Sequence, residues 1–427
     1  MRGALPPELR GLRGLWERIP GVPVAAALSC GLTVAIFMAG TYRLTVGSRG
    51  FRGAGDDHVY LYMTTHPVGS FRIAPWCWRI GIPALVRYLP VPPQDGYEAV
   101  ALTSVAVTGL LVYLIARTWG FARWLSLAGL LLFFSFGYAA KFNLKDFWLT
   151  DAPAFAFASA AILALQHRRK YLFAACLLAG VFVKESVIFV APLAYTFWAR
   201  QRLDWRALAR AGALALPAVA ALLALRAGIG SLNADHAYVA SLPQAVRSDV
   251  GNLPSYDVLA VASQTLAARS HTWLRTAGHT VSSFGLLPMV LVPLGWRDLK
   301  PVAVRFWPLA VLDLMQLVFA LNTQRLVVFA FVPVIIACLA GARRMVRRFG
   351  VFRVWFALAA ALAVGLEFAQ PAQSSPTPPV QTGALGALCA VAAAMTLWNA
   401  SGRWPVAGGT PGTPPQRLRC DDRALRG

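Results

Sequence analysis

Two adjacent carboxylates, Asp56 and Asp57, follow the first long apolar run of the chain by about ten residues. A carboxylate at the membrane surface could act as a general base toward an acceptor hydroxyl, or it could bind a divalent cation. His58 comes next and could assist either role. Asp is also a preferred helix N-cap, so an acidic turn that starts an interfacial helix is the structural alternative.

A second candidate site lies between Gly69 and Pro90, where Arg and Trp residues are interspersed with apolar residues. This pattern predicts an amphipathic helix in the membrane interface, with guanidinium groups and aromatic rings at headgroup depth. Arg72 and Arg79 could serve as simple membrane anchors. Either could instead hold a phosphate, because the planar guanidinium presents a fork of hydrogen-bond donors.

Charged residues also interrupt the apolar runs farther along the chain. Asp151 lies near the start of one run, where it could cap a helix or act as a functional carboxylate close to hydrocarbon. Lys184 and Glu185 are adjacent between two short apolar pieces and could form a structural ion pair. Asp313 lies within a predicted span, and Arg325 lies at the outer end of another. Ionisable groups in a membrane need a partner or a function, so each is a candidate.

The sequence lacks the motifs of several common binding and catalytic sites. It contains no P-loop, dinucleotide-binding glycine motif, HExxH zinc motif, GxSxG nucleophile elbow or CxxC pair. The histidine spacings match no metal site, and the six cysteines are scattered, which does not favour a disulfide framework. No metal ligand is therefore predicted, and a divalent cation is an option only at the acidic pair.

The composition excludes a soluble globular protein. Of the 427 residues, 57% are hydrophobic and only 14% are charged. The net charge of +22 arises mostly from Arg residues, many of them close to the ends of apolar runs. Such residues hold short loops in the cytoplasm and contact anionic lipids, so binding to nucleic acid need not be invoked.

The apolar runs predict an all-α fold, a polytopic transmembrane helical bundle of about ten full spans plus one short hairpin. The hairpin comprises residues 171–183 and 186–199, and its two basic flanks should both lie on the cytoplasmic side. The same rule places both termini inside. The predicted spans are 20–42, 99–116, 125–140, 147–166, 211–226, 279–296, 306–321, 326–341, 351–367 and 383–399.

Two long segments, 43–98 and 227–278, are predicted on the outer side. The first contains the acidic pair and the predicted interfacial helix. Residues 1–19 form the predicted cytoplasmic N-terminus, and 20–399 form the membrane domain. Residues 400–427, rich in Gly, Pro and Arg, are predicted to be a disordered cytoplasmic tail.

The order of these features resembles that of the bacterial members of the GT-C superfamily of polytopic glycosyltransferases. The resemblance extends over roughly residues 20–341 and rests on short motifs. The residues that carry it are Asp57 and Tyr60, the stretch Phe71-Arg72 with Pro75, the pairs Lys145-Asp146, Thr150-Asp151 and Lys184-Glu185, and Arg325 before Pro333.

The resemblance implies an enzyme of the bacterial inner membrane that transfers a sugar from a polyprenyl-phosphate carrier to a glycan, lipid or protein acceptor at the outer face. In that family an acidic residue of the first outer loop is the catalytic base. Its spacing to Tyr60 favours Asp57, with Asp56 as the alternative. The base would deprotonate the acceptor hydroxyl as it attacks the anomeric carbon with inversion.

Positive groups would stabilise the departing lipid phosphate in such a reaction, and Arg72, Lys184 and Arg325 are the positions that could do so. Some family members carry a large soluble C-terminal domain, whereas this sequence ends in the predicted tail, so segments 43–98 and 227–278 are expected to recognise the acceptor. The full predicted set of substrate-binding and phosphate-binding residues is Arg72, Arg79, Lys184, Glu185, Arg325, Asp151 and Tyr60.

Two other classes of function compete with this interpretation. A lipid-linked glycan flippase, polymerase or other multi-pass transporter would need ionisable residues within the spans, and only Asp313 clearly qualifies. A membrane scaffold without catalytic activity would tolerate exchange of Asp56 and Asp57 for Asn.

Overall fold

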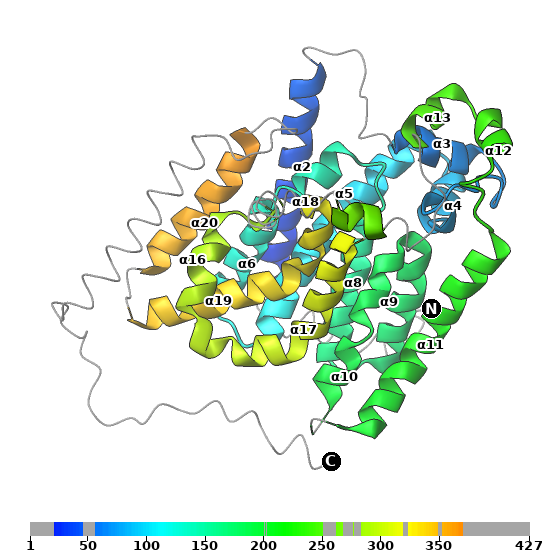
Figure 1. The fold of residues 1–427 in the computed structure, drawn as a ribbon. Coiled ribbons are helices and arrows are strands. Elements are labelled where there is room, and N and C mark those ends of the chain that lie inside the picture. The colour runs from blue at the N-terminus through cyan, green and yellow to red at the C-terminus, as the bar shows by residue number, and fades with distance from the viewer. Residues whose placement is uncertain are drawn as a thin grey trace, which may run out of the picture. The chain divides into compact units, whose positions relative to one another are not determined.

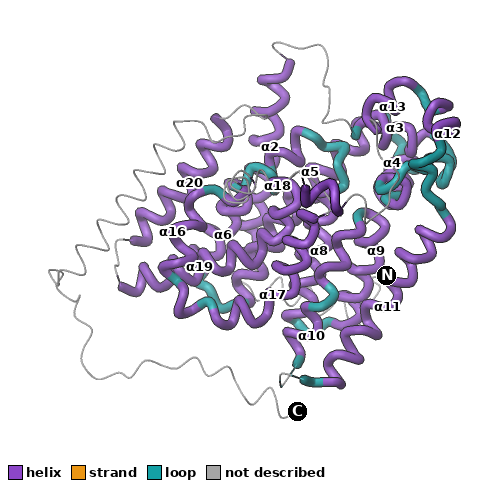
Figure 2. Tube along the Cα trace, in the orientation of Figure 1, coloured by secondary structure: helices purple, strands orange, loops and turns teal. Residues whose placement is uncertain are grey.

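The computed structural model describes most of the chain as helix (Figures 1 and 2). No strand occurs within the described ranges, so the predicted all-α class is confirmed. All the described residues belong to one unit, residues 1–381. The predicted span 383–399 and the predicted tail lie outside the described residues, which are 21–45, 56–199, 201, 203–250, 262–267, 276, 283–318, 323–348 and 352–369.

Five helical segments in the described part of the chain are long and apolar enough to cross a membrane, which indicates a multi-pass membrane protein. They coincide with five of the ten predicted spans, and the total of ten stays a prediction. The helices concerned are α2 (Val22–Thr45), α5 (Pro93–Thr118), α11 (Trp205–Gly228), α17 (Lys300–Met315) and α19 (Phe331–Arg348).

Shorter helices fill the space between these long ones. The predicted hairpin corresponds to α9 (Lys170–Val183) followed by η2 (Glu185–Val190) and α10 (Leu193–Trp198). Lys184 has an extended backbone, with φ −158° and ψ 132°, which ends α9 and reverses the chain. Gly180 permits the tight return, because a Cβ there would collide with Val187. The remaining helices of the bundle include α6 (Arg123–Ser135), α8 (Asp151–Gln166), α16 (Leu286–Leu294) and the 18-residue α20 (Phe352–Ala369).

The basic connections between helices meet at one end of the bundle. The guanidinium of Arg305, on α17, lies 5.0 Å from the ring of Trp119, just after α5. That of Arg343, on α19, lies 4.9 Å from the ring of Phe121. Connections predicted to lie inside are therefore neighbours in space, and the Asp151 end of α8 lies away from them. We call this the basic end of the bundle.

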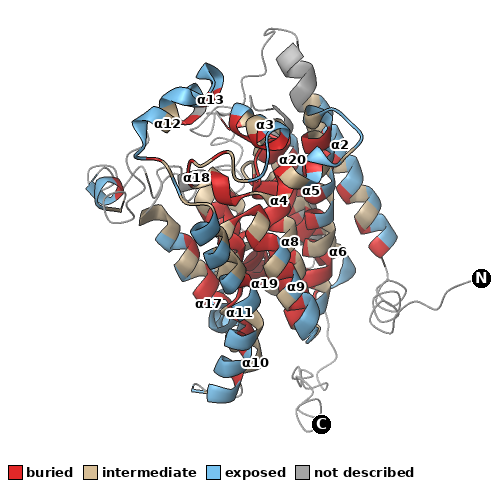
Figure 3. Ribbon diagram, turned by 90° about the vertical axis from the view of Figure 1, so that its right-hand side faces the viewer, coloured by how far each residue is buried: buried red, intermediate tan, exposed pale blue. Residues whose placement is uncertain are grey.

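The first outer segment folds differently from its sequence-based prediction. The amphipathic helix predicted between Gly69 and Pro90 is not one continuous helix: that stretch contains two short helical pieces, η1 (Trp76–Trp78) and α4 (Gly81–Arg87). Pro75 disfavours helix in the residue before it and lacks a backbone N–H to donate. Phe71 and Trp78 are also buried, so the stretch packs into the protein (Figure 3).

The two outer segments pack against each other. Helix α3 (Asp57–Thr65) contacts α13 (Gln244–Val250), which follows α12 (His236–Ser241). The side chain of Asn233 accepts the backbone N–H of Ala74 at 2.8 Å and donates to its carbonyl at 3.1 Å. Helices α3, α4, α12 and α13 consequently gather at one end, at the upper right of Figure 1.

Candidate functional site

Asp151, the first residue of α8, lies buried between two cations. One carboxylate oxygen accepts from the ammonium of Lys184. The other accepts from Arg325, with its Nη2 at 2.6 Å and its Nε at 2.7 Å. Thr150 occupies the N-cap position, and its side chain caps no described backbone N–H. The carboxylate of Asp151 therefore takes part in ion pairs with both Lys184 and Arg325.

Lys184 and Glu185 do not pair with each other, contrary to the simplest interpretation of their adjacency. The extended backbone at Lys184 directs successive side chains to opposite sides. Lys184 binds Asp151, whereas Glu185 accepts two hydrogen bonds from Arg79, at 3.0 and 2.6 Å. This two-pronged pairing of guanidinium and carboxylate ties the hairpin to the first outer segment.

Arg325 extends the ion pairs to the acidic pair of the first outer segment. Its Nη1 lies 3.6 Å from Oδ2 of Asp56 while its other nitrogens bind Asp151. Asp56 is the N-cap residue of α3, yet its side chain caps no backbone N–H among the described residues. Arg325 thus joins the start of α3 to the start of α8. We refer to Asp56, Arg79, Asp151, Lys184, Glu185 and Arg325 as the charged cluster.

Asp57 lies at the margin of this arrangement. It begins α3, where a negative charge is favoured by the helix dipole. Its Oδ1 lies 3.4 Å from Nδ1 of His58, and its side chain is 16% exposed. The side chain of Asp56 is 11% exposed and faces Arg325, so Asp57 is only slightly more exposed than Asp56.

Tyr60 is buried beside the charged cluster, one turn along α3. Its hydroxyl lies 3.5 Å from Oγ1 of Thr150. Burial raises the pKa of Tyr60, and the positive charge of Arg79 opposes only part of that effect. The phenol therefore keeps its proton at neutral pH and is available as a hydrogen-bonding group.

Arg72 is directed away from the charged cluster. Its Nε donates to the carbonyl of Gly230 at 3.0 Å, and its backbone N–H donates to the hydroxyl of Tyr238 at 2.8 Å. Arg72 therefore joins the two outer segments. Tyr238 and Asn233 were not predicted as functional residues, because isolated Tyr and Asn residues in a long segment belong to no motif or periodic pattern.

Asp313 lies on α17 within a candidate span and is buried. One of its carboxylate oxygens accepts from Nε2 of Gln316 at 3.0 Å. The other has no hydrogen-bond partner among the described residues. The positive charge of Lys184 interacts with the carboxyl group of Asp313, so Asp313 lies close to the charged cluster.

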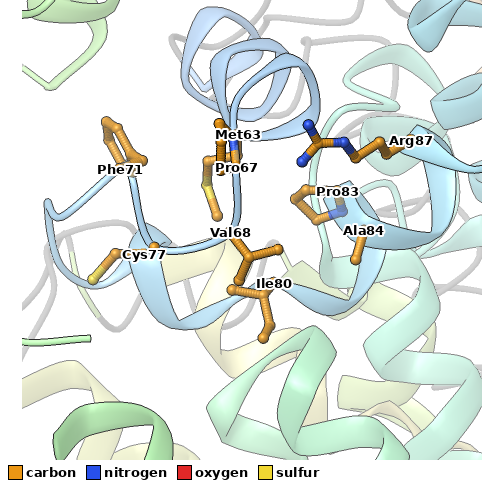
Figure 4. Close-up of a pocket in the computed structure, with 10 residues that line it drawn as sticks. Met63, Pro67, Val68, Phe71, Cys77, Ile80, Pro83, Ala84 and Arg87 are labelled. Carbon is orange, nitrogen blue, oxygen red and sulfur yellow. The ribbon is translucent and has the colours of Figure 1, made fainter. Parts of the chain in front are cut away.

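A small cavity lies next to α4 in the first outer segment (Figure 4). Its volume is about 10 Å³, which is room for about one water molecule. The walls are mostly apolar and include Met63, Phe71, Cys77 and Pro83, with Arg87 at the side. This cavity is too small for a sugar or a lipid phosphate, so it is not the substrate site.

The acidic residues near the site do not form an evident metal centre. No group of three or more His, Cys, Asp or Glu side chains that could hold a metal ion occurs in the part of the chain that the structure describes. The chemistry available to the charged cluster is that of carboxylates, guanidinium groups, an ammonium and a buried phenol. No family model, curated protein or solved structure matches the chain.

Proposed function

We propose that the protein is a membrane glycosyltransferase that moves a sugar from a polyprenyl-phosphate carrier to the hydroxyl of an acceptor. The observation that supports this most directly is the position of Asp56. Its carboxylate lies in the first outer segment and is held beside Arg325, at the edge of a buried set of ion pairs. A rigidly positioned carboxylate next to a cation is what a base-assisted transfer from a phosphate carrier requires.

The charged cluster would hold its reactive groups in place through paired charges. Within the described residues it has three acidic and three basic side chains, so its charge is balanced before any substrate arrives. Ion pairs of this kind leave their side chains little freedom, since each guanidinium is fixed at two or more points. Such fixed positions favour transfer, because catalytic groups that are already oriented need little rearrangement in the transition state.

In this proposal the base removes the proton of the acceptor hydroxyl while the oxygen attacks the anomeric carbon. The bond between that carbon and the phosphate oxygen breaks, and the phosphate keeps the electron pair. Arg325 is the cation that the structure places beside Asp56, so it is the group best positioned to meet the developing phosphate charge. Attack opposite to the leaving phosphate inverts the configuration of the sugar.

Asp56 and Asp57 are both candidates for the base. Asp56 is supported by Arg325, which orients it, whereas Asp57 is supported by the neighbouring His58 and by its spacing to Tyr60. The two candidates differ in which variant should be inactive. An enzyme that uses Asp56 should lose transfer in Asp56→Asn and retain much of it in Asp57→Asn.

The experiment measures transfer of radiolabelled sugar from a panel of polyprenyl-phosphate sugars by the full-length protein in vesicles. Wild type is compared with Asp56→Asn and Asp57→Asn at equal amounts of folded protein. We expect loss of one base to reduce the rate by about 100-fold or more, the usual contribution of general-base catalysis. Asp95→Asn is the matched control, because Asp95 is an exposed carboxylate at the start of α5.

A wild-type protein that transfers no sugar from the panel, or two Asp variants as active as Asp95→Asn, would contradict the proposal. A flippase, polymerase or other transporter is the second candidate, supported by the buried Asp313 in a candidate span. That alternative predicts movement of the lipid-linked sugar across the bilayer without transfer, and loss of the movement in Asp313→Asn.

A further inference from the structure

A larger cavity lies at the basic end of the bundle, where α10 meets α11. Helix α11 has 24 residues, and so is about 36 Å long. Its far end is joined to the first outer segment through Ile229, whose carbonyl accepts from the indole of Trp78. The cavity is therefore well separated from the charged cluster. Its volume is about 570 Å³, and it is lined by Trp198, Gln201, Leu203, Asp204, Trp205, Arg206, Ala207 and Arg210.

The lining has an excess of positive charge. Arg206 and Arg210 lie one turn apart on α11, and neither forms an ion pair with another described residue. Asp204 is the acidic residue of the lining. Its Oδ1 accepts the backbone N–H of Ala207 at 3.0 Å and so caps the helix. The cavity thus has two cationic side chains and one carboxylate, which caps the helix. This excess of positive charge suits an anionic ligand.

The exposed face of α11 indicates what kind of molecule carries that anion. Trp205, Leu208, Leu216 and Leu223 are 70%, 47%, 63% and 60% exposed, and their spacing places them along one stripe of the helix. Helix α11 is a candidate span, and only 11% of its apolar window is buried (Figure 3). A Trp at the start of such a helix belongs at the level of the lipid headgroups. The cavity therefore opens at headgroup depth beside a surface that suits acyl chains.

We propose that this cavity binds the headgroup of an anionic phospholipid, whose acyl chains lie along the exposed stripe of α11. Arg206 and Arg210 would hold the phosphate oxygens, for which guanidinium groups are well suited. The indole N–H of Trp198 is buried at the cavity and has no hydrogen-bond partner among the described residues, so it offers a further donor. The lipid would hold α10 against the start of α11. This site is independent of the proposed transferase activity.

The experiment is native mass spectrometry of the full-length protein in detergent. Phosphatidylglycerol or phosphatidylcholine with identical acyl chains is added, and the bound lipid is counted. Wild type should retain phosphatidylglycerol in preference to phosphatidylcholine. The double variant Arg206→Gln/Arg210→Gln should bind phosphatidylglycerol about tenfold or more weakly, because each basic residue near an anionic headgroup contributes substantially to binding. The double variant Arg206→Lys/Arg210→Lys, which keeps the charge, should retain part of the binding.

The matched control is Arg168→Gln/Arg169→Gln. These two exposed residues lie between α8 and α9 and do not line the cavity. The control removes the same charge and should bind phosphatidylglycerol as the wild type does. Arg206 and Arg210 are themselves exposed, so their exchange should leave the elution profile of the folded protein unchanged. Three results would overturn the proposal: equal loss of binding in Arg206→Gln/Arg210→Gln and in the control, no loss in Arg206→Gln/Arg210→Gln, or equal retention of the two lipids by wild type.

Discussion

Asp151 is the residue on which the charged cluster depends most, because it alone holds two of the three basic side chains. Lys184 binds one of its oxygens and Arg325 the other. Removing one member of a buried ion pair leaves an uncompensated charge, which costs more than the pair itself contributes. The members of the cluster should therefore differ in how far their loss destabilises the protein.

Asp151→Asn should lower the free energy of unfolding by about 3–5 kcal/mol, since it removes the carboxylate that pairs with both Lys184 and Arg325. Lys184→Gln should cost less, because Asp151 keeps Arg325. Midpoints of heat-induced aggregation, followed by size-exclusion chromatography in detergent, give the order of the two variants. The explanation fails if Lys184→Gln melts at or below the midpoint of Asp151→Asn.

Residue type identified most of the members of the site, but the sequence could not pair them. Charges next to long apolar runs were sufficient to select Asp151, Lys184 and Arg325, because such charges are rare. Pairing depends on contacts across the fold. Arg325 and Asp151, for example, are in contact although they lie 174 positions apart in the sequence. Adjacency in sequence even suggested a wrong pair, Lys184 with Glu185, since an extended backbone sends neighbouring side chains apart.

Helices α16 and α19 owe their close contact to two glycines. An added Cβ on Gly295, at the end of α16, would lie 2.7 Å from Cα of Gly341 on α19. An added Cβ on Gly341 would collide with the carbonyl of Leu291. Small residues allow helix backbones to approach in this way, and that contact supports association in a membrane.

Gly341→Ala should destabilise the protein by about 1–3 kcal/mol, because the methyl group forces the helices apart. Gly212→Ala serves as the control: Gly212 lies within α11, and an added Cβ there meets no atom within 4 Å. The control should be neutral or more stable by up to about 1 kcal/mol, since Ala favours helix over Gly. The account of this contact would be contradicted if both variants unfolded at a lower temperature than the wild type, or if neither did.

Long apolar elements and the short hairpin were predictable from sequence, and the short helices of the first outer segment were not. Helices such as α5 and α11 need little more than an uninterrupted apolar run. The stretch from Gly69 to Pro90 has the composition of an interfacial helix, yet its apolar residues are buried against the rest of the fold. Composition reports how apolar a segment is, whereas the direction it faces depends on partners such as Asn233.

The described part of the molecule has a basic end and an end that carries the charged cluster. Arg305 and Arg343 lie at the first, and Asp56 and Arg325 lie at the second. Basic loops are retained in the cytoplasm, so the two ends should lie on opposite sides of the membrane. The outer segments with α3 and α12 belong to the second end.

A membrane-impermeant maleimide tests this arrangement in intact cells, using a chain whose six cysteines are replaced by alanine. Asp95→Cys and Ser241→Cys should react in intact cells, because both positions are exposed at the cluster end. Arg168→Cys, at the basic end, should react only after the membrane is permeabilised. If all three positions were labelled in intact cells, or if none were, the proposed orientation would be wrong.

The span of sequence that Arg325 bridges has a consequence for biosynthesis. Asp151 and Lys184 are 33 residues apart, so they can meet soon after both have left the ribosome. Arg325 emerges 174 residues after Asp151, which at about 5–20 residues per second corresponds to roughly 10–35 s of synthesis. During that interval Asp56 and Asp151 must enter the membrane region without the guanidinium that later joins them. The contact between Asp56 and Arg325 can therefore form only late in translation, after most of the described helices have been synthesised.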